Sequence, residues 1–462
     1  MTTSALNDTI LGRIVDDKKR WIAARKKAQP LESFVDQLTP SDRDFRAALA
    51  APGSQFILEC KKASPSKGVI RDDFDPAAIA QAYKPFATAI SVLTDEDYFQ
   101  GSFDFLPIVR DQVDAPVLCK DFIIDPYQVY LARHYQADAI LLMLSVLDDA
   151  EYRELADLAE SLKLGVLTEV STEDELARAN ALGAVVIGIN NRNLRDLSID
   201  RDRTKRLAPQ VGEKAIVISE SGIHSHRHVR DLADYADGFL IGSALMAEPD
   251  LTLALRKVIL GDNKVCGLTS ADDALAAYDA GAVYGGLIFV EHSPRAVTPA
   301  VAERVQQGAP LRYVGVFQNH AIETVAAHAH QLNLHAVQLH GDEDAAYLQA
   351  LRERLPTHCE MWKAHGVSDV APALDGVDAD RHLIDSRVGQ QSGGTGKTFD
   401  WHLIPKAAKD KVMIAGGLTP DNAAKAAAQG CLGLDFNSGV EHAPGVKDAH
   451  KLNAAFRALR RY

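Results

Sequence analysis

The sequence contains little cysteine and no long apolar segment, and each shortage excludes a class of protein. Its 462 residues include five cysteines, which are odd in number and widely spaced: Cys60, Cys119, Cys266, Cys359 and Cys431. This pattern offers neither a disulfide framework nor the close spacing of a cysteine metal site. No uninterrupted apolar run approaches the length that spans a membrane. The first 27 residues have the pattern of an amphipathic helix rather than of a secretion signal, so we expect a cytoplasmic protein.

Positive charge is also in short supply. The chain has 50 lysine and arginine residues against 63 acidic residues, which gives a formal net charge of −13. This balance argues against nucleic acid or an anionic membrane as a partner. It leaves a small anionic substrate open, because a few basic side chains and backbone N–H groups determine the field inside a cleft. The chain is too long for one hydrophobic core, and two or three domains are expected.

Short apolar runs alternate with longer, alanine-rich amphipathic stretches along the whole chain. In the first half, the runs that we expect to be strands are 56–60, 88–93, 116–119, 138–143, 165–169, 185–190, 215–219 and 237–241. In the second half they are 264–266, 284–289, 313–317, 335–339, 360–364, 381–385, 412–415 and 432–436. Nearly all are continuous rather than alternating in polarity, which is typical of strands buried on both faces of a parallel sheet.

Eight strand–helix units in each half favour an α/β fold of two consecutive (βα)8 TIM barrels, at residues 1–260 and 261–462. Alternating units of this kind imply parallel strands joined by right-handed crossovers. The alternative is a pair of open, doubly wound sheets, but neither half has the GxGxxG pattern after its first strand. We expect the boundary near Gly261-Asp262-Asn263, after a helix at 251–259.

Charged and polar residues gather at the carboxyl ends of the expected strands in the first half: Glu59, Lys61, Lys120, Glu169, Asn190 and Glu220. The interior of such a barrel is filled by side chains, so its reacting groups come from the strand ends. Any one of these residues alone is more simply a solvated rim charge. Because several strand ends converge, we expect lysines near carboxylates in one cleft, where they can transfer protons and bind anions.

Small residues follow the seventh and eighth expected strands of both halves. The first half has Ser221-Gly222 and Gly242-Ser243, and the second has Gly416-Gly417 and Asn437-Ser438. Free N–H groups at such turns attract phosphate, and the loops after strands seven and eight are where these barrels hold one. A tight turn that requires glycine would explain one of these sites alone, but it explains the pair in each half less easily.

The remaining strand ends and loops of the second half carry Cys266, Arg295, His340 and Asp385. A cysteine and an aspartate on opposite sides of a barrel mouth can act as a base and an acid. For Cys266 alone, a small buried core residue is an equally good interpretation.

One glycine-rich stretch, 392–398, imitates a nucleotide-binding motif. It ends like GxxxxGK[ST], but the pattern needs glycine where the chain has Gln391, and no helix follows directly. We interpret it as a loop that can close over a ligand.

Several motifs resemble two enzymes of tryptophan biosynthesis. Four stretches of the first half resemble indole-3-glycerol-phosphate synthase. They are Glu59-Cys60-Lys61-Lys62-Ala63-Ser64-Pro65-Ser66, Cys119-Lys120-Asp121-Phe122, Asn190-Asn191-Arg192-Asn193-Leu194 and Ser219-Glu220-Ser221-Gly222-Ile223. Stretches of the second half resemble phosphoribosylanthranilate isomerase. They are Cys266-Gly267-Leu268-Thr269, Gln338-Leu339-His340-Gly341, Asp385-Ser386 with the loop 393–398, and the stretch 415–420. The resemblance covers essentially the whole chain, and the order of synthase and isomerase is that of the bifunctional enzyme of enteric-type bacteria.

For the first half, the resemblance implies that 1-(2-carboxyphenylamino)-1-deoxyribulose 5-phosphate closes into an indole ring with loss of carbon dioxide and water. Lys120 would be the general acid on the substrate carbonyl, and Glu169 its partner in the proton transfers of dehydration. Lys61 would pair with the anthranilate carboxylate, while Glu59 and Asn190 would orient and stabilise the intermediate. Both lysines end strands near carboxylates, so the division of acid and base roles between Lys61 and Lys120 stays open.

The resemblance also implies the rest of this pocket. Ser221 and Glu220 would line it, and the phosphate would be held by Ser64, Gly222, Gly242 and Ser243.

For the second half, the resemblance implies an Amadori rearrangement of phosphoribosylanthranilate, which needs one acid and one base. Asp385 would protonate the furanose oxygen and Cys266 would take the C2 proton. Arg295 would meet the anthranilate carboxylate of the substrate, and Gly416, Gly417 and Ser438 would meet its phosphate. His340 would also bind the substrate. Many isomerases carry two serines in the final motif where this chain has Asn437-Ser438, which leaves open which group there contacts phosphate.

The resemblance implies no metal and no organic cofactor in either half. The expected partners are small phosphorylated anthranilate–sugar substrates, without nucleic acid or membrane, and we expect a monomer. Two other hypotheses stay open. One is a Schiff-base aldolase on the same fold with Lys120 as nucleophile, and the other is a phosphosugar-binding scaffold without catalysis.

Overall fold

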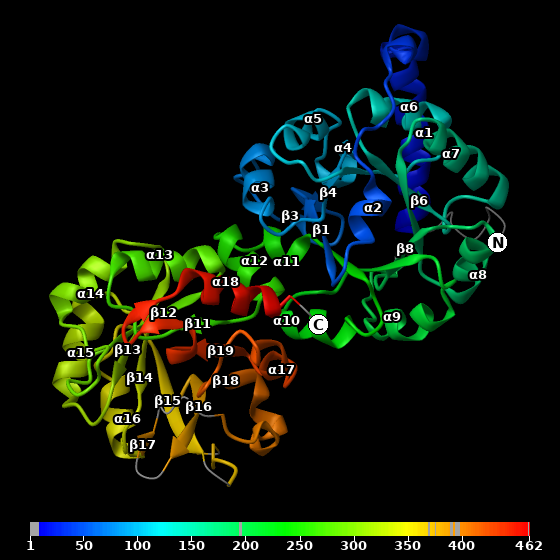
Figure 1. Ribbon diagram of the computed structural model, residues 1–462. Coiled ribbons are helices and arrows are strands. Elements are labelled where there is room, and N and C mark those ends of the chain that lie inside the picture. The colour runs from blue at the N-terminus through cyan, green and yellow to red at the C-terminus, as the bar shows by residue number, and fades with distance from the viewer. Residues whose placement is uncertain are drawn as a thin grey trace. The chain divides into compact units, whose positions relative to one another are not determined.

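The structure is a computed structural model that describes residues 9–193, 196–367, 370–374, 376–388, 391–392, 398–460 and 462 (Figure 1). The chain divides into two compact units, Met1–Leu255 and Arg256–Tyr462. The predicted boundary at 260/261 lies a few residues after this division, and helix α12 (Leu251–Ile259) spans the division. No described helix is long and apolar enough to cross a membrane.

Eight parallel strands close into a barrel in the first unit. They are β1 (Gln55–Cys60), β4 (Ala89–Leu93), β5 (Val117–Lys120), β6 (Ala139–Met143), β7 (Gly165–Val170), β8 (Val186–Asn190), β9 (Ile216–Glu220) and β10 (Gly238–Ile241). The barrel closes because β1 pairs with β4 on one side and with β10 on the other. Most of these strands are buried along their whole length, as the continuous apolar runs predict.

Helices follow most of these strands and surround the barrel (Figure 1). They are α3 (Pro76–Tyr83), α4 (Glu96–Phe99), α5 (Phe105–Arg110), α6 (Pro126–His134), α7 (Asp149–Ser161), α8 (Glu173–Ala181), α9 (Asp202–Leu207), α10 (His226–Leu232) and α11 (Ser243–Met246), with α1 (Ile10–Ala28) and α2 (Phe45–Leu49) before the first strand. Local signals begin them. Asp75 and Asp125 precede prolines, and their carboxylates accept first-turn N–H groups at 2.9 and 2.8 Å.

A second closed barrel forms the second unit. Its strands are β11 (Lys264–Val265), β12 (Tyr284–Ile288), β13 (Arg312–Phe317), β14 (Ala336–Leu339), β15 (Glu360–Val367), β16 (Arg381–Val388), β18 (Val412–Ile414) and β19 (Gly433–Phe436). Its α-helices are α13 (Ala271–Ala280), α14 (Pro299–Gln306), α15 (Ile322–Gln331), α16 (Ala345–Arg352), α17 (Ala423–Ala427) and α18 (Ala449–Ala458). Closure comes from β11 pairing with β19 and from β15 pairing with β16. The prediction of two consecutive barrels is therefore confirmed.

The part of the second barrel around β15 and β16 differs from the expected strand bounds. Both strands continue three residues beyond their predicted ends, with His365, Gly366 and Val367 paired to Ile384, Asp385 and Ser386. The extension carries polar residues, so an apolar run could not reveal it. Gln391 and Ser392, at the start of the imitated nucleotide motif, form β17, which folds back on β16. Residues 393–397 of that loop, like Leu194 of the first half, lie outside the described residues.

At the amino ends of the first barrel's strands, a buried carboxylate holds several elements together. Asp138 precedes β6 and accepts the Val117 N–H at 3.0 Å and the Ser41 hydroxyl at 2.8 Å. Arg110 donates to both of its oxygens at 3.2–3.3 Å. This end of the barrel therefore carries structural charge, in contrast to the opposite end, where the predicted site residues lie.

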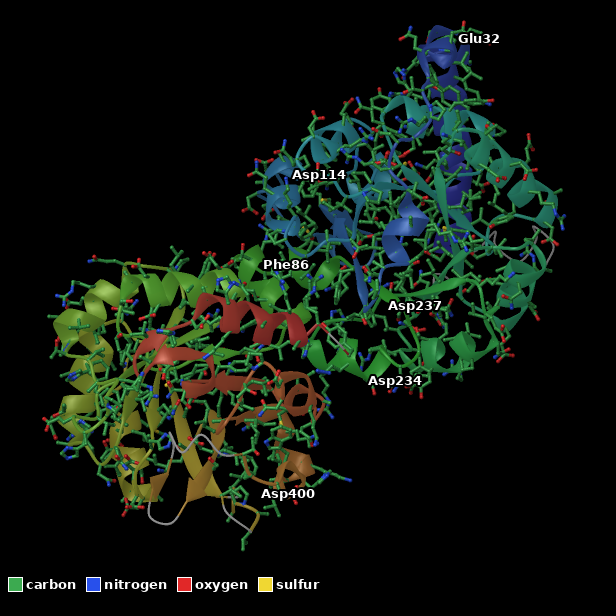
Figure 2. All side chains as sticks on the ribbon, viewed as in Figure 1. Glu32, Phe86, Asp114, Asp234, Asp237 and Asp400 are labelled. Carbon is green, nitrogen blue, oxygen red and sulfur yellow. The ribbon has the colours of Figure 1, made fainter. Side chains whose placement is uncertain are left out.

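We predict that Asp138→Ala destabilises the first unit strongly. Removing one partner of a buried, hydrogen-bonded ion pair costs about 3–5 kcal/mol, because the other partner is left uncompensated. Hydrogen exchange followed by mass spectrometry should show lost protection in peptides of β5 and β6, with the second unit unchanged. Asp114→Ala is the control, since Asp114 is an exposed residue of the same unit (Figure 2). Equal protection in the two variants would contradict this role of Asp138.

Candidate functional site

The first barrel contains a cavity of about 150 Å³ at the carboxyl ends of its strands. Every residue that the sequence predicted for the first site lines it: Glu59, Lys61, Ser64, Lys120, Glu169, Asn190, Glu220, Ser221, Gly222, Gly242 and Ser243. The structure thus brings together groups from six strands and the loops that follow them.

Lys120 is the central cation of this cavity. Its Nζ donates to Glu220 Oε2 at 2.7 Å and lies 3.8 Å from Glu169 Oε2. Burial opposes the charged form, but the attraction of Glu220, Glu169 and Glu59 outweighs it and raises the pKa of Lys120. Lys120 is therefore a charged ammonium at neutral pH.

Glu169 titrates in the neutral range. Burial and the nearby charge of Glu220 raise the pKa of Glu169 to about 7, against the attraction of Lys120. The Asn190 amide donates to Glu169 Oε1 at 3.0 Å and fixes the orientation of the carboxyl group. Among the described residues Glu220 Oε1 has no hydrogen-bond partner although it is buried. It has room because position 188 is glycine, where a Cβ would collide with that oxygen.

A second ion pair lies on another side of the same cavity. Lys61 Nζ donates to Glu59 Oε2 at 2.5 Å. Burial opposes ionisation of Glu59, but Lys61 and Lys120 together lower its pKa. Gly242 leaves space for this carboxylate, because a Cβ there would collide with Glu59 Oε2. The two lysines therefore differ, since Lys61 pairs with one carboxylate at close range and Lys120 lies between two.

Two of the small residues at the first mouth have a backbone conformation that is unusual for residues other than glycine. Ser221 and Gly222 follow β9 with φ of 68° and 77°, in the left-handed region that a serine rarely adopts. Such strain is concentrated at functional sites. Gly242 precedes α11, and Ser64 lies in β2 (Ala63–Ser64), which pairs with β3 (Gly68–Val69).

Several lining residues were missed from the sequence. Leu11 and Ile14 of α1 line the cavity, as do Phe122 and Arg192. Lys18 of α1 is 3% exposed and bonds Asp95 and Asp121, both at 2.7 Å, so it ties the helix to the loops after β4 and β5. The amphipathic pattern predicted that α1 is a helix, but it could not show that the apolar face of this helix lines the cavity. Phe122 and Arg192 stand within the motifs that resemble the synthase, two residues after Lys120 and Asn190, and this was the signal available for them.

In the second barrel, Cys266 follows β11 and is buried, with its N–H donating to Phe436 O at 2.8 Å. Asp385 is on β16, and burial together with the charge of Asp435 raises the pKa of Asp385 to about 7. His340 Nε2 lies 3.8 Å from Asp385 Oδ2. Burial and the charge of Lys264 lower the pKa of His340 to about 4, so the imidazole is neutral at pH 7. A protonated carboxyl and a neutral imidazole can therefore coexist here.

Arg295 is already engaged within the protein. Its Nε and Nη2 donate to the two carboxylate oxygens of Glu441 at 2.8 and 2.7 Å. Lys447 also donates to Glu441, at 2.7 Å, and to Asn437 Oδ1 at 3.2 Å. The guanidinium is thus fixed in orientation, with Nη1 outside the paired contact. Glu441 and Lys447 were not identified from the sequence.

The glycine-rich turn after β18 has two consecutive residues in the left-handed region, Gly416 with φ of 83° and Gly417 with φ of 60°. At Gly416 a Cβ would lie 2.6 Å from Asp385 Oδ1, so glycine also admits that carboxyl group. Ser438 begins the short 3-10 helix η7 (Ser438–Val440) after β19. Within the described part of the chain, no group of three or more His, Cys, Asp or Glu residues is arranged to hold a metal ion.

Comparison with known proteins matches both barrels. The family model of indole-3-glycerol phosphate synthase matches residues 11–258, and that of N-(5'phosphoribosyl)anthranilate (PRA) isomerase matches residues 263–458. The tryptophan biosynthesis protein TrpCF of Vibrio cholerae is 62% identical over 98% of this chain and 96% of its own length. That of Salmonella typhi is 60% identical over 98% of this chain and 100% of its own length.

The chain belongs to the TrpCF family of bifunctional synthase–isomerases. Among solved structures, the phosphoribosyl anthranilate isomerase of Thermotoga maritima is 33% identical, with 43% of this chain and 98% of that chain covered and a TM-score of 0.39.

Both activities of the TrpCF family are therefore carried by this chain. The C-terminal barrel isomerises N-(5-phosphoribosyl)anthranilate to 1-(2-carboxyphenylamino)-1-deoxyribulose 5-phosphate. The N-terminal barrel converts that product to indole-3-glycerol phosphate with loss of carbon dioxide and water. The second barrel makes what the first consumes.

We predict a carboxyl group in the synthase barrel that titrates with a midpoint near pH 7. Infrared difference spectra between the unchanged chain and Glu169→Gln should isolate this signal, because the pKa of Glu169 is raised to about 7. In Lys120→Met the midpoint should move to higher pH, since the attraction that favours the carboxylate is lost. A Glu169 signal that titrates near pH 4 in both chains would contradict the geometry described above.

Proposed function

We propose that the two barrel mouths are separate proton-transfer sites, whose acids and bases are the strand-end residues identified from the sequence. The observation that carries this proposal is Lys120, a largely buried ammonium within 2.7 and 3.8 Å of two carboxylates in the cavity at the strand ends. Proton donors and acceptors in such mutual reach are what ring closure followed by dehydration requires.

In the synthase barrel, Lys120 is the general acid that protonates the substrate carbonyl oxygen as the ring carbon attacks the carbonyl carbon. Loss of carbon dioxide restores the aromatic ring. Glu169, with its pKa near 7, can then accept and return the protons that accompany loss of water. Asn190 supports this role by holding Glu169 at 3.0 Å. With Lys120 as the general acid, Lys61 is the lysine that binds the substrate.

Lys61 pairs with the anthranilate carboxylate in this account. Its present partner is Glu59, at 2.5 Å, so the substrate carboxylate shares an ammonium that is already oriented. Glu59 stays ionised and stabilises positive charge on the intermediate, because Lys61 and Lys120 lower its pKa. The phosphate is held by the N–H groups and hydroxyls of Ser64, Gly222, Gly242 and Ser243, and Ser221 and Glu220 line the same pocket.

The Schiff-base alternative is disfavoured by the charge of Lys120. A lysine nucleophile must lose its proton to attack a carbonyl, and Lys120 has carboxylates around it that raise its pKa. Borohydride with a keto-phosphate should therefore trap no adduct on Lys120.

In the isomerase barrel, Asp385 gives its proton to the furanose oxygen and the ring opens to an iminium. The Cys266 thiolate then removes the C2 proton, and the electrons of that bond form the C1–C2 double bond and neutralise the nitrogen. Asp385 suits the acid role because its pKa is near 7, and neutral His340 lies 3.8 Å away. Arg295 meets the anthranilate carboxylate with the part of its guanidinium that Glu441 leaves open. Gly416, Gly417 and Ser438 bind the phosphate.

We also propose that the protein works as a cytoplasmic monomer. Every residue assigned to each site comes from a single barrel, so neither site needs a second chain. The five cysteines are all free thiols, which is typical of proteins from reducing compartments. Light scattering on the purified chain should give the mass of one 50.1 kDa polypeptide. A dimer mass that persists on dilution would contradict the proposal.

Single substitutions should separate the two activities. Lys120→Ala should reduce indole-3-glycerol phosphate formation by a factor of at least about 100 and leave the isomerase unchanged, because loss of general acid catalysis alone costs this much. Asp385→Ala should do the reverse. Each reaction is followed with its own substrate, and the untouched activity of each variant is the control for folding.

Two outcomes would contradict the assignment. If either change removed both activities from folded protein, the two-site division would fail. If Lys120→Ala and Cys266→Ala altered only ligand affinity, the residues would be binding groups without a part in the chemistry.

A further inference from the structure

A buried lysine lies beside Cys266 and has no part in the roles assigned so far. Lys264 is on β11, two residues before Cys266, and its side chain is 0% exposed. Its Nζ donates to Asp435 Oδ2 at 2.9 Å, and the two residues are paired across β11 and β19. Both side chains are inside the barrel that contains the isomerase site.

Lys264 and Cys266 meet at one point of the neighbouring strand. A Cβ built at Gly286 would lie 2.7 Å from Cys266 Sγ and 3.0 Å from Lys264 Cε, so only glycine leaves room for both. The two side chains also act on each other's ionisation. Asp435, Lys264 and Cys266 therefore form a continuous chain of contacts across the strands β19 and β11.

This ion pair is poorly suited to a purely structural role. Burying an ammonium and a carboxylate costs free energy that is recovered only when every polar atom is paired, and apolar residues of similar size often stabilise a core as well or better. Here Asp435 Oδ1 is buried without a hydrogen-bond partner among the described residues. An incompletely satisfied buried charge that touches a reactive thiol points to a role in the reaction.

Four charged groups act on Cys266 from the elements packed around it. Lys264 is on its own strand, Asp435 on β19, Lys447 on β21 (Val446–Lys447), and Arg295 in the loop after β12. Burial raises the pKa of the thiol, Lys264 and Lys447 oppose that rise, and Asp435 adds to it. Glu441 offsets the two more distant cations, because it pairs with both Arg295 and Lys447. Among the charged groups around it, Lys264 has the largest effect on the thiol.

We propose that Lys264, held by Asp435, is a positioning residue that keeps the Cys266 side chain ready to accept a proton in the isomerase reaction. The inference rests on the proposed role of Cys266 as the base. Lys264 keeps its own proton throughout, while the sulfur passes from thiolate to thiol as the C2–H bond breaks. Its contact would make the thiolate accessible at a lower pH than burial alone allows.

The pH dependence of the isomerase tests this proposal. In Lys264→Met, the limb of kcat/KM that follows titration of the Cys266 thiol should move to higher pH by about one to three units, the usual effect of a close opposite charge. In Asp435→Asn it should move to lower pH, because a nearby anion is lost. A structural defect alone would lower the rate without opposite displacements of the limb. Synthase activity of the same chains is the control and should not change.

A direct titration of the thiol separates this proposal from the role of Cys266 itself. The ultraviolet absorbance of the Cys266 thiolate, obtained as the difference from Cys266→Ala, should appear at higher pH in Lys264→Met than in the unchanged chain. The double variant Lys264→Met/Asp435→Asn removes the pair without leaving an unpaired charge, and it should retain a smaller shift in the same direction. The double variant replaces Lys264→Met in this titration if the single variant does not fold.

Each result has one meaning. Full isomerase activity in Cys266→Ala would overturn the proposed base, while the thiol titration would still report on Lys264. An unchanged thiol titration and an unchanged pH limb in the Lys264 variants would overturn the positioning role.

Discussion

Each barrel depends on a largely buried lysine that is held by a carboxylate from another strand of the same barrel. In the synthase barrel this is Lys120 with Glu220, at 2.7 Å, and in the isomerase barrel it is Lys264 with Asp435, at 2.9 Å. Because these charges are largely withdrawn from water, each affects the protonation of its neighbours. The near-neutral pKa values of Glu169 and Asp385 follow from burial beside a second carboxylate. The same fold thereby supports two different proton-transfer reactions.

Missing side chains shape these sites as much as the charged ones do. Glu220, Glu59 and the Cys266 thiol each occupy space that a Cβ on an adjacent strand or loop would fill, at Gly188, Gly242 and Gly286. Two consecutive residues in the left-handed region follow the seventh strand of each barrel. The two mouths are therefore built alike after their seventh strands and differ in the charged groups beside them. This agrees with the general rule that the fold alone does not determine the chemistry.

The strands and their order were predictable because parallel strands buried on both faces leave continuous apolar runs in the sequence. Closure of the barrel then requires their polar ends to converge, which is why Lys120 and Glu169 could be placed in one cleft beforehand. The sequence could not reveal contacts between distant residues that break the simple pattern. Lys18 looks like a solvated residue of an amphipathic helix but is buried between two aspartates, and Arg295 is paired with Glu441 from a later turn. Such pairings depend on three-dimensional closure and not on local periodicity.

The central claim is that one chain contains two independent sites, each complete within its own barrel. The most direct measurement mixes equal amounts of Lys120→Ala and Asp385→Ala chains, supplies phosphoribosylanthranilate, and follows indole-3-glycerol phosphate and carbon dioxide. Neither variant alone should complete the sequence, but the mixture should, because the intermediate made by one chain reaches the intact synthase barrel of the other. A mixture that forms no indole-3-glycerol phosphate, although each chain keeps its remaining activity, would contradict the account.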